Sequence, residues 1–242
     1  MITKEQMKTN KTTAITVGIF YLAAMVTYSV GNGLIQSILG APDHLAAVPA
    51  NSQLVVIGAL LMLINSAIVI GHGIMMHPIL KQHSERIPVG YLSARIVEGA
   101  VLAVGVVFLL LQIPLGREYL QAGSADASYF QMLSTLSVQA NFYSYQLGMI
   151  AVGFAGGMLN YIFYRTTLVP RALAVWGLLG YIVLFVGSVV EISGYNQQLM
   201  HTIPGGLWEL FMGVWLIAKG FGSSVFVPRT MKTNSAAEPL VS

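Results

Sequence analysis

Six long apolar stretches, separated by short polar connections, constrain this chain of 242 residues more than any other feature. Each stretch is long enough to cross the hydrocarbon core of a bilayer as an α-helix, which takes about 20 residues. The stretches cover residues 14–39, 54–80, 89–113, 145–164, 172–193 and 206–225. The pattern predicts an all-α polytopic bundle of six membrane-spanning helices, with residues 1–225 as a single domain and residues 226–242 as a polar cytoplasmic tail.

The composition excludes several classes of protein. Charged residues make up 9% of the chain and hydrophobic residues 55%, whereas a soluble domain carries about 25% charged residues. The net charge of +3 is not gathered into a dense basic patch, so no nucleic-acid partner is expected. Cysteine is absent, which excludes disulfides, thiolate catalysis and cysteine-bound metals. With no motif for a metal, a nucleotide or a catalytic serine, no cofactor is predicted.

The distribution of lysine and arginine predicts the orientation of the bundle. If both termini are cytoplasmic, nine basic residues fall in inner segments and one, Arg117, falls in an outer loop. The inner residues are Lys4, Lys8, Lys11, Lys81, Arg86, Arg165, Arg171, Arg229 and Lys232. Because basic residues gather on the cytoplasmic side, we expect an even number of crossings with both termini inside.

The stretch before the fourth span is harder to interpret. A helix running without interruption from residue 128 to residue 164 would be about 55 Å long, which exceeds the thickness of a bilayer. Residues 128–143 are also rich in Ser, Thr, Gln and Asn. We therefore expect an outer amphipathic or re-entrant helix over 128–143, preceded by a water-exposed loop over 114–127.

Four ionisable residues fall at similar depths on the inner side of the predicted spans. Arg95 and Glu98 are three positions apart, so they lie on one helix face and can form an ion pair. His72 and Lys219 reach the same layer from two other spans. Charges inside a membrane are costly and mark functional sites, so this layer is a candidate binding or proton-relay site centred on Glu98. A purely structural ion pair, with Lys219 extending to the interface, is the alternative.

A second polar group is expected toward the outer side. Glu191 lies near the end of the fifth predicted span, and Glu209 lies one turn into the sixth. Asn32, Tyr145 and Gln146 fall at comparable depth. Two carboxylates among polar and aromatic side chains suit a pocket for a cation or an amine. The alternative is that both glutamates lie in water at the level of the lipid headgroups.

Two further features concern the surface of the bundle. Arg165 and Arg171 bracket a short inner turn, where they would bind the phosphate of an anionic lipid or anchor the turn. Gly153, Gly156 and Gly157 form a smooth patch on the fourth span that allows a helix to approach closely. This patch predicts packing within the monomer or, alternatively, a homodimer.

Three motifs resemble one known family. Arg-Ile-Val-Glu-Gly at residues 95–99, Leu-Val-Pro-Arg at 168–171 and Pro-Gly-Gly-Leu-Trp-Glu at 204–209 are similar to segments of the bacterial membrane-protein family of unknown function numbered 4386. The resemblance extends from the first span to Phe221. It implies a multi-pass protein of the bacterial cytoplasmic membrane, but it assigns no activity, cofactor or residue role.

Three classes of function fit these observations. The first is binding or transport of a small molecule or ion at the polar site around Glu98, with membrane lipids as surroundings. The second is a non-catalytic accessory, sensor or immunity-type protein that acts through contact with a membrane-protein partner. The third, an intramembrane enzyme, is supported only by the paired carboxylates, without a nucleophile or metal set. The sequence therefore favours a protein that is not an enzyme.

Overall fold

The computed structural model describes residues 4–196 and 198–222, with side chains for 11–122, 127–196 and 198–222. Every regular element in these ranges is helical, which confirms the all-α prediction. The elements are α1 (Lys4–Leu39), α2 (His44–Ala50), α3 (Ser52–Lys81), α4 (Ile87–Leu110), α5 (Gln112–Thr166), α6 (Arg171–Ile192), the 3-10 helix η1 (Met200–Thr202) and α7 (Ile203–Lys219).

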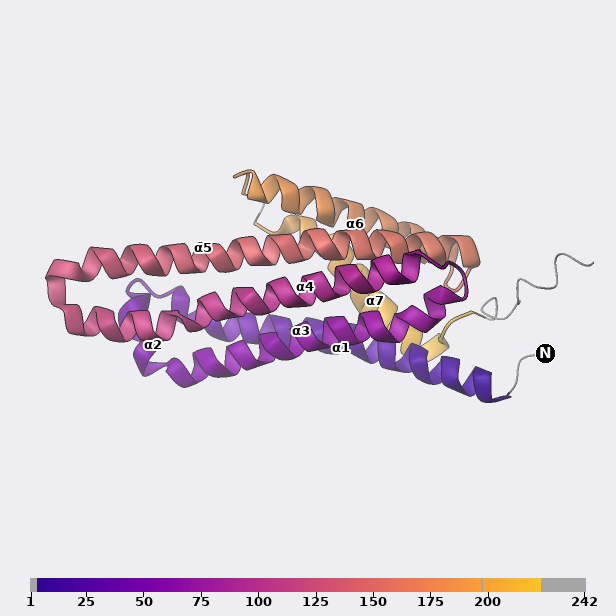
Figure 1. The fold of residues 1–242 in the computed structure, drawn as a ribbon, viewed down its shortest axis with the longest axis horizontal. Helices are drawn as coiled ribbons and strands as arrows, with labels where there is room; N and C mark the ends of the chain where they lie inside the picture. Colours follow the sequence, from indigo (N-terminus) through magenta and orange to yellow (C-terminus); the bar gives the residue numbers. More distant parts are fainter. Residues whose placement is uncertain (1–3, 197, 223–242) are drawn as a thin grey trace, which may run out of the picture.

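The helices form an elongated bundle whose parts differ in length. α1, α3, α4 and α5 lie side by side along the long axis, with the start of α5 continuing α4, whereas α6 and α7 cover only the half nearer the N-terminus (Figure 1). Five apolar stretches are long enough to cross a membrane: Lys11–Leu39, Ser52–Lys81, Ile87–Ala122, Ala127–Thr166 and Arg171–Ile192. They contain the first four predicted spans and the fifth up to residue 192.

The range of α5 contains a reversal of the chain. Gln112 Nε2 donates to the Ser134 carbonyl at 3.2 Å, and Ser137 Oγ donates to the Phe108 carbonyl at 2.9 Å. These contacts require the chain to turn back, which Figure 1 shows at the end of the molecule farthest from the N-terminus. Residues 112–122 therefore extend the course of α4, and residues 127–166 run back beside it.

This hairpin corrects two predictions. Residues 128–143 do not form a separate amphipathic or re-entrant helix, because they belong to the uninterrupted stretch Ala127–Thr166. Most of the segment over 114–127 is also not a loop, because residues 114–122 continue the helical course of α4 up to the reversal. Ala127–Thr166 has 40 residues and is about 60 Å long, which exceeds the thickness of a bilayer. The helix is nevertheless uninterrupted, because it extends beyond α6 along the neighbouring helices (Figure 1).

The sixth predicted span, 206–225, corresponds to α7, which has 17 residues. At 1.5 Å per residue it is about 26 Å long, slightly less than the hydrocarbon core of a bilayer. The helix ends where Gly220 adopts a φ of 73°, a conformation that glycine reaches without steric cost. Residues 223–225 and the predicted tail over 226–242 lie outside the described residues.

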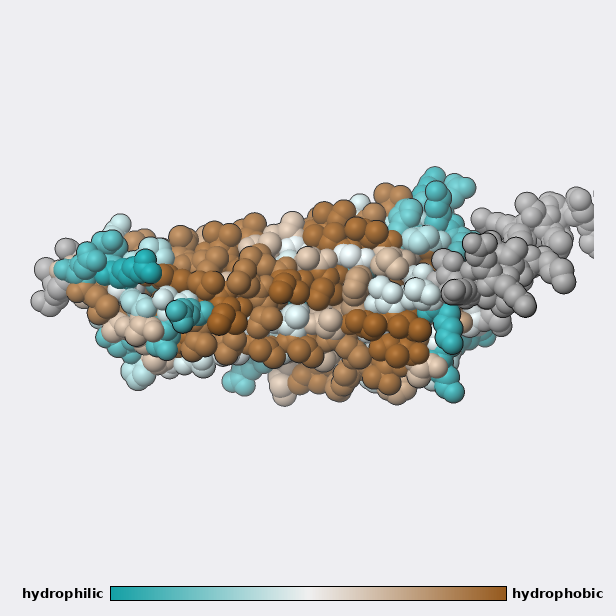
Figure 2. Space-filling model, turned by 90° about the horizontal axis from the view of Figure 1, so that it is seen from below, coloured by the Kyte–Doolittle hydropathy of each residue, from teal (hydrophilic) through white to brown (hydrophobic). Residues whose placement is uncertain are grey.

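The surface is that of a membrane protein. Figure 2 shows a broad hydrophobic band around the middle of the molecule and hydrophilic groups toward its two ends. Large apolar side chains face outward within this band, including Phe154 at 59% exposure and Leu179 at 58%. Such a surface suits contact with lipid chains and not with water.

Glycines allow the helices to approach one another closely. A Cβ atom added at Gly58 of α3 would lie 2.7 Å from the Gly31 carbonyl oxygen of α1, and one at Gly18 would lie 2.6 Å from that of Gly213 on α7. Between membrane helices the hydrophobic effect is weak, so close van der Waals packing over small residues drives association. The glycines are therefore a main source of the bundle's cohesion.

The glycine patch on α5 packs within the monomer. A side chain at Gly153 would meet Phe185 of α6, and one at Gly156 would overlap the ring of Tyr181. Gly157, in contrast, has no neighbouring atom within 4 Å of the Cβ position. Gly153 and Gly156 thus allow α6 to pack closely against α5.

A polar cluster fastens the short helix α2 to the α4–α5 hairpin. His44 Nε2 lies 2.8 Å from Ser134 Oγ, which in turn donates to Gln112 Oε1 at 2.6 Å. A serine next to a histidine can signal a nucleophile, but Ser134 is fully buried and its proton is directed to Gln112. The cluster therefore has a structural role, because it holds α2 against the α4–α5 hairpin.

The glycine contacts generate the first prediction. Gly156→Ala should destabilise the protein by about 1–3 kcal/mol, because the new methyl group overlaps Tyr181. Gly157→Ala on the same helix should leave stability unchanged or raise it by up to about 1 kcal/mol, because alanine favours the helix. Thermal unfolding of both variants in the same detergent measures the difference. Equal effects of the two substitutions would contradict the packing of α5 on α6.

Candidate functional site

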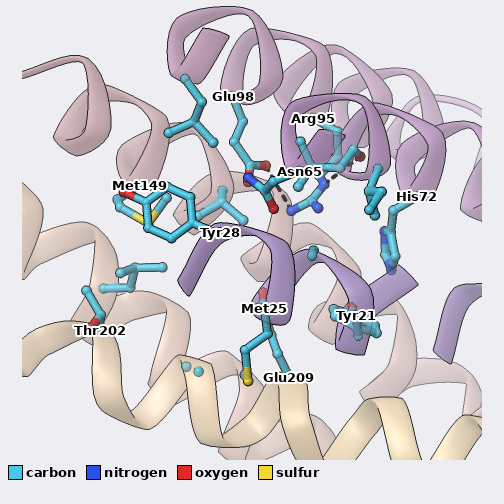
Figure 3. A pocket seen from close by; sticks show the side chains of 18 of the residues that line it. Tyr21, Met25, Tyr28, Asn65, His72, Arg95, Glu98, Met149, Thr202 and Glu209 are labelled. Carbon is cyan, nitrogen blue, oxygen red and sulfur yellow. Dashed lines mark hydrogen bonds and ion pairs between the residues drawn. The ribbon is translucent and has the colours of Figure 1, made fainter. Parts of the chain in front are cut away.

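A cavity of about 210 Å³ lies inside the half of the bundle that α6 and α7 cover, and six helices, α1, α3, α4, α5, α6 and α7, line it. Its walls contain many polar side chains for an intramembrane space. These are Tyr21, Tyr28, Ser29, Asn65, His72, Arg95, Glu98, Tyr145, Tyr181, Thr202 and Glu209. Figure 3 shows several of them converging on this space from different helices.

The ion pair between Arg95 and Glu98 forms one wall of the cavity. Arg95 Nη1 lies 2.8 Å from Glu98 Oε2, and the two side chains are 6% and 5% exposed. Arg95 Nε also donates to the Val69 carbonyl of α3 at 3.2 Å. The predicted pairing of Arg95 with Glu98 on one face of α4 is confirmed. Buried pairs of this kind depend on each other, because removal of one partner leaves an uncompensated charge.

Two glycines place this charged face of α4 inside the bundle. A Cβ atom at Gly73 of α3 would lie 2.9 Å from the Cβ of Arg95, and one at Gly99 would lie 2.8 Å from the Ser66 carbonyl oxygen. Larger residues at either position would separate α3 from α4. The pair is buried because the two backbones approach closely at this level.

His72 presents a ring nitrogen without a partner. Its Nδ1 lies 2.8 Å from the Tyr91 hydroxyl, and the ring of Tyr21 packs edge-on at a centroid distance of 4.4 Å. His72 Nε2 is buried and has no hydrogen-bond partner among the described residues. An unsatisfied buried nitrogen is costly, so a side chain that lines a cavity in this state is suited to contact a ligand or water.

Glu209 brings a second carboxylate to the cavity from α7. Its Oε1 accepts a hydrogen bond of 2.7 Å from the Tyr181 hydroxyl of α6. Trp208, next in sequence, is fully buried behind the rings of Tyr181 and Tyr21, at centroid distances of 5.5 and 5.9 Å. This packing fixes the start of α7 and thereby the position of Glu209.

The cavity reaches the molecular surface beside the start of α7. Ser29 of α1 lines the cavity and is exposed, and Thr202, Gly205 and Gly206 line the cavity from η1 and from the start of α7. Tyr28, next to Ser29 in sequence, stacks on Tyr145 of α5 at a centroid distance of 5.5 Å. The mouth is therefore framed by α1 and by the connection between α6 and α7.

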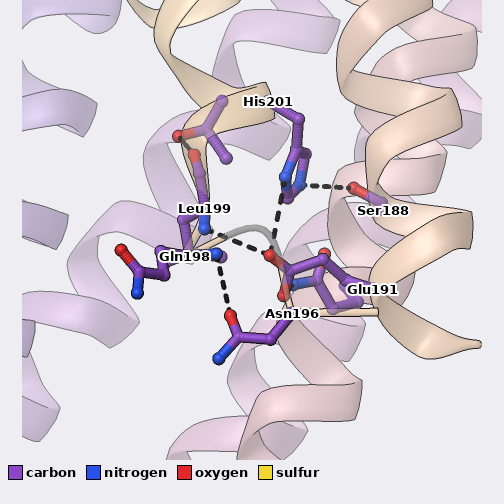
Figure 4. A network of polar contacts seen from close by, with 8 residues as sticks. Ser188, Glu191, Asn196, Gln198, Leu199 and His201 are labelled. Carbon is purple, nitrogen blue, oxygen red and sulfur yellow. Dashed lines mark hydrogen bonds and ion pairs between the residues drawn. The ribbon is translucent and has the colours of Figure 1, made fainter. Parts of the chain in front are cut away.

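Glu191 belongs to a different polar network, which ties down the connection between α6 and α7 (Figure 4). Its Oε1 accepts from the backbone N–H of Leu199 at 3.1 Å, and its Oε2 accepts from Gln146 Nε2 at 3.2 Å. His201 Nδ1 lies 3.8 Å from Glu191 Oε1, and Ser188 Oγ lies 3.3 Å from His201 Nε2. The network joins α5, α6 and η1.

The structure thus divides the predicted site residues. Glu98, Arg95, His72, Glu209 and Tyr145 share the cavity, which joins the deep layer to part of the outer group. Gln146 and Glu191 pair with each other, and neither they nor Asn32 line the cavity. Glu191 and Glu209 therefore do not line this cavity together.

Lys219 does not lie in the layer of Arg95. It is exposed and lines a separate groove of about 370 Å³ with Arg171 and Trp215. The depth estimate failed because it assumed that the sixth span begins at residue 206 and ends beyond Lys219, whereas α7 ends at Lys219. Arg171 and Arg165 lie over the rings of Tyr164 and Tyr161 at 5.6 and 6.0 Å.

Several lining residues were missed in the sequence. Asn65 is a polar residue in the middle of an apolar span, a signal that points to a functional position. Tyr21 and Tyr181 give no such signal, because tyrosine is common near membrane interfaces. No cluster of three or more His, Asp or Glu side chains suited to a metal ion occurs among the described residues.

Comparison with known proteins places the chain in a family. Residues 16–220 match the model described as "Domain of unknown function (DUF4386)", and the chain belongs to this family. The resemblance noted in the sequence motifs is confirmed. No curated protein and no solved structure matches the chain.

The network around Glu191 predicts a pH dependence. Burial lowers the pKa of His201 below its ordinary value of 6.5, although Glu191 acts in the opposite direction. The unfolded chain then binds more protons between the lowered pKa and 6.5, so this stabilisation is complete above pH 6.5 and is lost as the pH falls. The wild type should therefore unfold at a lower temperature at about pH 5 than at about pH 7.5. His201→Gln should reduce this difference, and an unchanged difference would contradict the role of His201.

The mouth of the cavity generates a prediction about accessibility. The chain contains no cysteine, so a single introduced cysteine reports on its own position. Ser29→Cys should react with a charged, water-soluble thiosulfonate, because Ser29 lines the polar cavity at its mouth. Val97→Cys should stay unmodified, since Val97 is 52% exposed on the apolar face of α4. Equal reactivity of the two cysteines, measured by mass spectrometry, would contradict an aqueous mouth beside Ser29.

Proposed function

We propose that this member of the DUF4386 family binds a small polar ligand in the cavity between its helices, with Glu98 as a central charge of the site. The observation that carries the proposal is the placement of Arg95, Glu98 and Glu209 around one cavity inside an apolar bundle. Ionisable groups in such surroundings are costly, which favours a functional reason for each. The lack of a nucleophile–base pair in the cavity favours binding or transport over catalysis.

The state of the lining residues supports a ligand over a purely structural ion pair. A pair that served packing alone would be enclosed by apolar side chains or by satisfied polar groups. Here the Arg95–Glu98 pair and His72 line one cavity, and His72 Nε2 has no hydrogen-bond partner among the described residues. The cavity volume of 210 Å³ exceeds the ~150 Å³ that accommodates a benzene molecule. A ligand with a polar group would find partners among these side chains.

The proposed setting is the cytoplasmic membrane of a bacterium, with both termini in the cytoplasm. The connections at 82–86 and 167–170 lie at the same end of the bundle as the N-terminus (Figure 1). The basic residues near these connections, among them Arg86 and Arg171, favour that end as the inner one. α7 would supply the sixth crossing, and the mouth beside Ser29 would then open toward the outside.

The inner end also has the character of a lipid-binding surface. We include in the proposal that Arg165 and Arg171 contact the phosphates of anionic lipids. Both side chains are exposed and flank the short connection between α5 and α6. Tyrosine rings below the two guanidinium groups would hold them at the level of the headgroups.

A double substitution separates ligand binding from a structural role of the ion pair. Glu98→Gln alone should destabilise the protein by about 3–5 kcal/mol, because it leaves Arg95 buried without a counter-charge. Replacing both Arg95 and Glu98 by methionine removes the two charges together, so the bundle should remain folded. Native mass spectrometry in nanodiscs should then show a small-molecule adduct on the wild type and none on the double variant.

The control is Glu118→Gln, which changes an exposed carboxylate outside the cavity and should retain the adduct. A folded double variant that carries the same adduct as the wild type would contradict the proposed site. A wild type that carries no small molecule but copurifies with a membrane-protein partner would favour a function through protein contact.

A further inference from the structure

The charges that line the cavity do not balance. Two carboxylates, Glu98 and Glu209, face one guanidinium, Arg95. Arg95 lies 2.8 Å from Glu98, so these two charges compensate each other. The carboxylate of Glu209 has the Tyr181 hydroxyl as its one hydrogen-bond partner among the described residues. With all three groups ionised, the cavity carries one surplus negative charge, which low-dielectric surroundings make costly without a counter-charge.

The walls of the cavity that contains this surplus charge include several aromatic rings and a polarisable thioether. The rings of Tyr21, Tyr28, Tyr145 and Tyr181 line the cavity together with Met149. The face of an aromatic ring attracts a cation within about 6 Å, and such walls recognise organic ammonium groups. Aromatic and thioether groups also provide apolar contact for the rest of an organic molecule.

The same walls are unsuited to a bare metal ion. Calcium takes 6–8 oxygen ligands, and magnesium requires a near-octahedral oxygen shell. The described residues contain no group of three or more acidic or histidine side chains that could hold a metal. The surplus charge therefore fits a cation that needs one carboxylate and an apolar enclosure.

We propose that the ligand is a small organic monocation whose ammonium group pairs with Glu209 and whose body lies against the tyrosine rings. This inference rests on the proposed function and specifies the class of ligand. A proton is the alternative counter-charge for Glu209, so ammonium and proton exclude each other. When R–NH3+ enters, the carboxylic acid of Glu209 releases its proton to water and becomes the partner of the ammonium. The net charge of the cavity is the same in both states.

Every other helix around the cavity contributes titratable groups to its lining, in addition to Glu209 of α7. They are Tyr181 from α6, Arg95 and Glu98 from α4, Tyr21 from α1, His72 from α3 and Tyr145 from α5. Arg95 forms its ion pair with Glu98, and no ion pair to Glu209 occurs among the described residues. The exchange of a proton for the ammonium group at the Glu209 carboxylate is therefore the step that should respond to pH.

Three probes of nearly the same shape test the charge of the ligand. Benzylammonium, benzyl alcohol and benzoate each place a polar group on a benzene ring, a size that suits a cavity of 210 Å³. Equilibrium dialysis against wild-type protein in nanodiscs should show binding of benzylammonium, with much weaker binding of the alcohol and the acid. On the acid side of the pH range, the Kd for benzylammonium should rise about tenfold for each unit of pH decrease, as one proton competes for Glu209.

Two variants test the assignment to Glu209. Glu209→Gln keeps the size of the side chain and removes its charge, so the affinity for benzylammonium should fall at least about thirtyfold. Glu118→Gln removes an exposed carboxylate outside the cavity and should bind like the wild type. Tyr181→Phe removes the hydrogen bond to Glu209 but keeps the carboxylate, so it should still prefer the ammonium over the neutral alcohol. Thermal unfolding confirms that each variant is folded.

The outcomes distinguish this inference from the proposed function. Benzoate or benzyl alcohol binding as tightly as benzylammonium, or unchanged affinity in folded Glu209→Gln, would overturn the organic cation while a ligand site remains. Absence of binding for all three probes would also overturn it. The adduct measurement on the Arg95 and Glu98 double variant then decides separately whether the cavity holds a ligand of another class.

Discussion

The burial of an arginine and a glutamate inside an apolar bundle is the constraint on which the rest of this structure depends. Each ion loses several kcal/mol of hydration when it leaves water, and the loss is recovered only by close pairing and further hydrogen bonds. The contact of 2.8 Å between Arg95 and Glu98 and the hydrogen bond from Arg95 to the Val69 carbonyl meet this requirement. They also require α3 and α4 to lie close together at this level.

Glycine makes that approach possible and shapes the cavity. Gly73 and Gly99 bring α3 and α4 together around the ion pair, and Gly18 and Gly213 bring α7 against α1. Beyond the contact at Gly18, α1 lines the cavity from Phe20 to Ser29, and α7 lines it from Gly205 to Glu209. The hydrogen bonds of Glu191 fix the connection between α6 and α7, which leads into the cavity wall. The same two helices, α1 and α7, thus pack closely at Gly18 and Gly213 and line the cavity farther along.

Much of the fold could be predicted from the sequence, because the length and apolarity of a span are local properties. The pairing of Arg95 with Glu98 was predictable for the same reason, since a spacing of three fixes one helix face. Residues 128–143 were misjudged because their polar side chains suggested an interface. Ser134 and Ser137 instead make hydrogen bonds inside the α4–α5 hairpin.

Which residues line the cavity depends on how each helix is rotated about its axis and on where α7 ends. Neither property can be predicted from the sequence. Glu209 was placed with Glu191 by depth alone, yet α7 turns it toward Tyr181 and the cavity of Arg95. Lys219 was placed with Arg95 by counting residues, yet it lies at the exposed end of α7. Asn65 was visible as a polar residue in an apolar span, and only the cavity that it lines shows that it joins the site.

The most direct test is a crystal structure of the protein grown from a lipid phase, examined for density between α1, α4 and α7. The prediction is an open cavity, with Arg95 paired to Glu98, Glu209 held by Tyr181, and density for a bound molecule or ordered water beside His72. A bundle in which apolar side chains close this space, or in which Glu209 faces lipid away from Arg95, would contradict a ligand site inside the membrane.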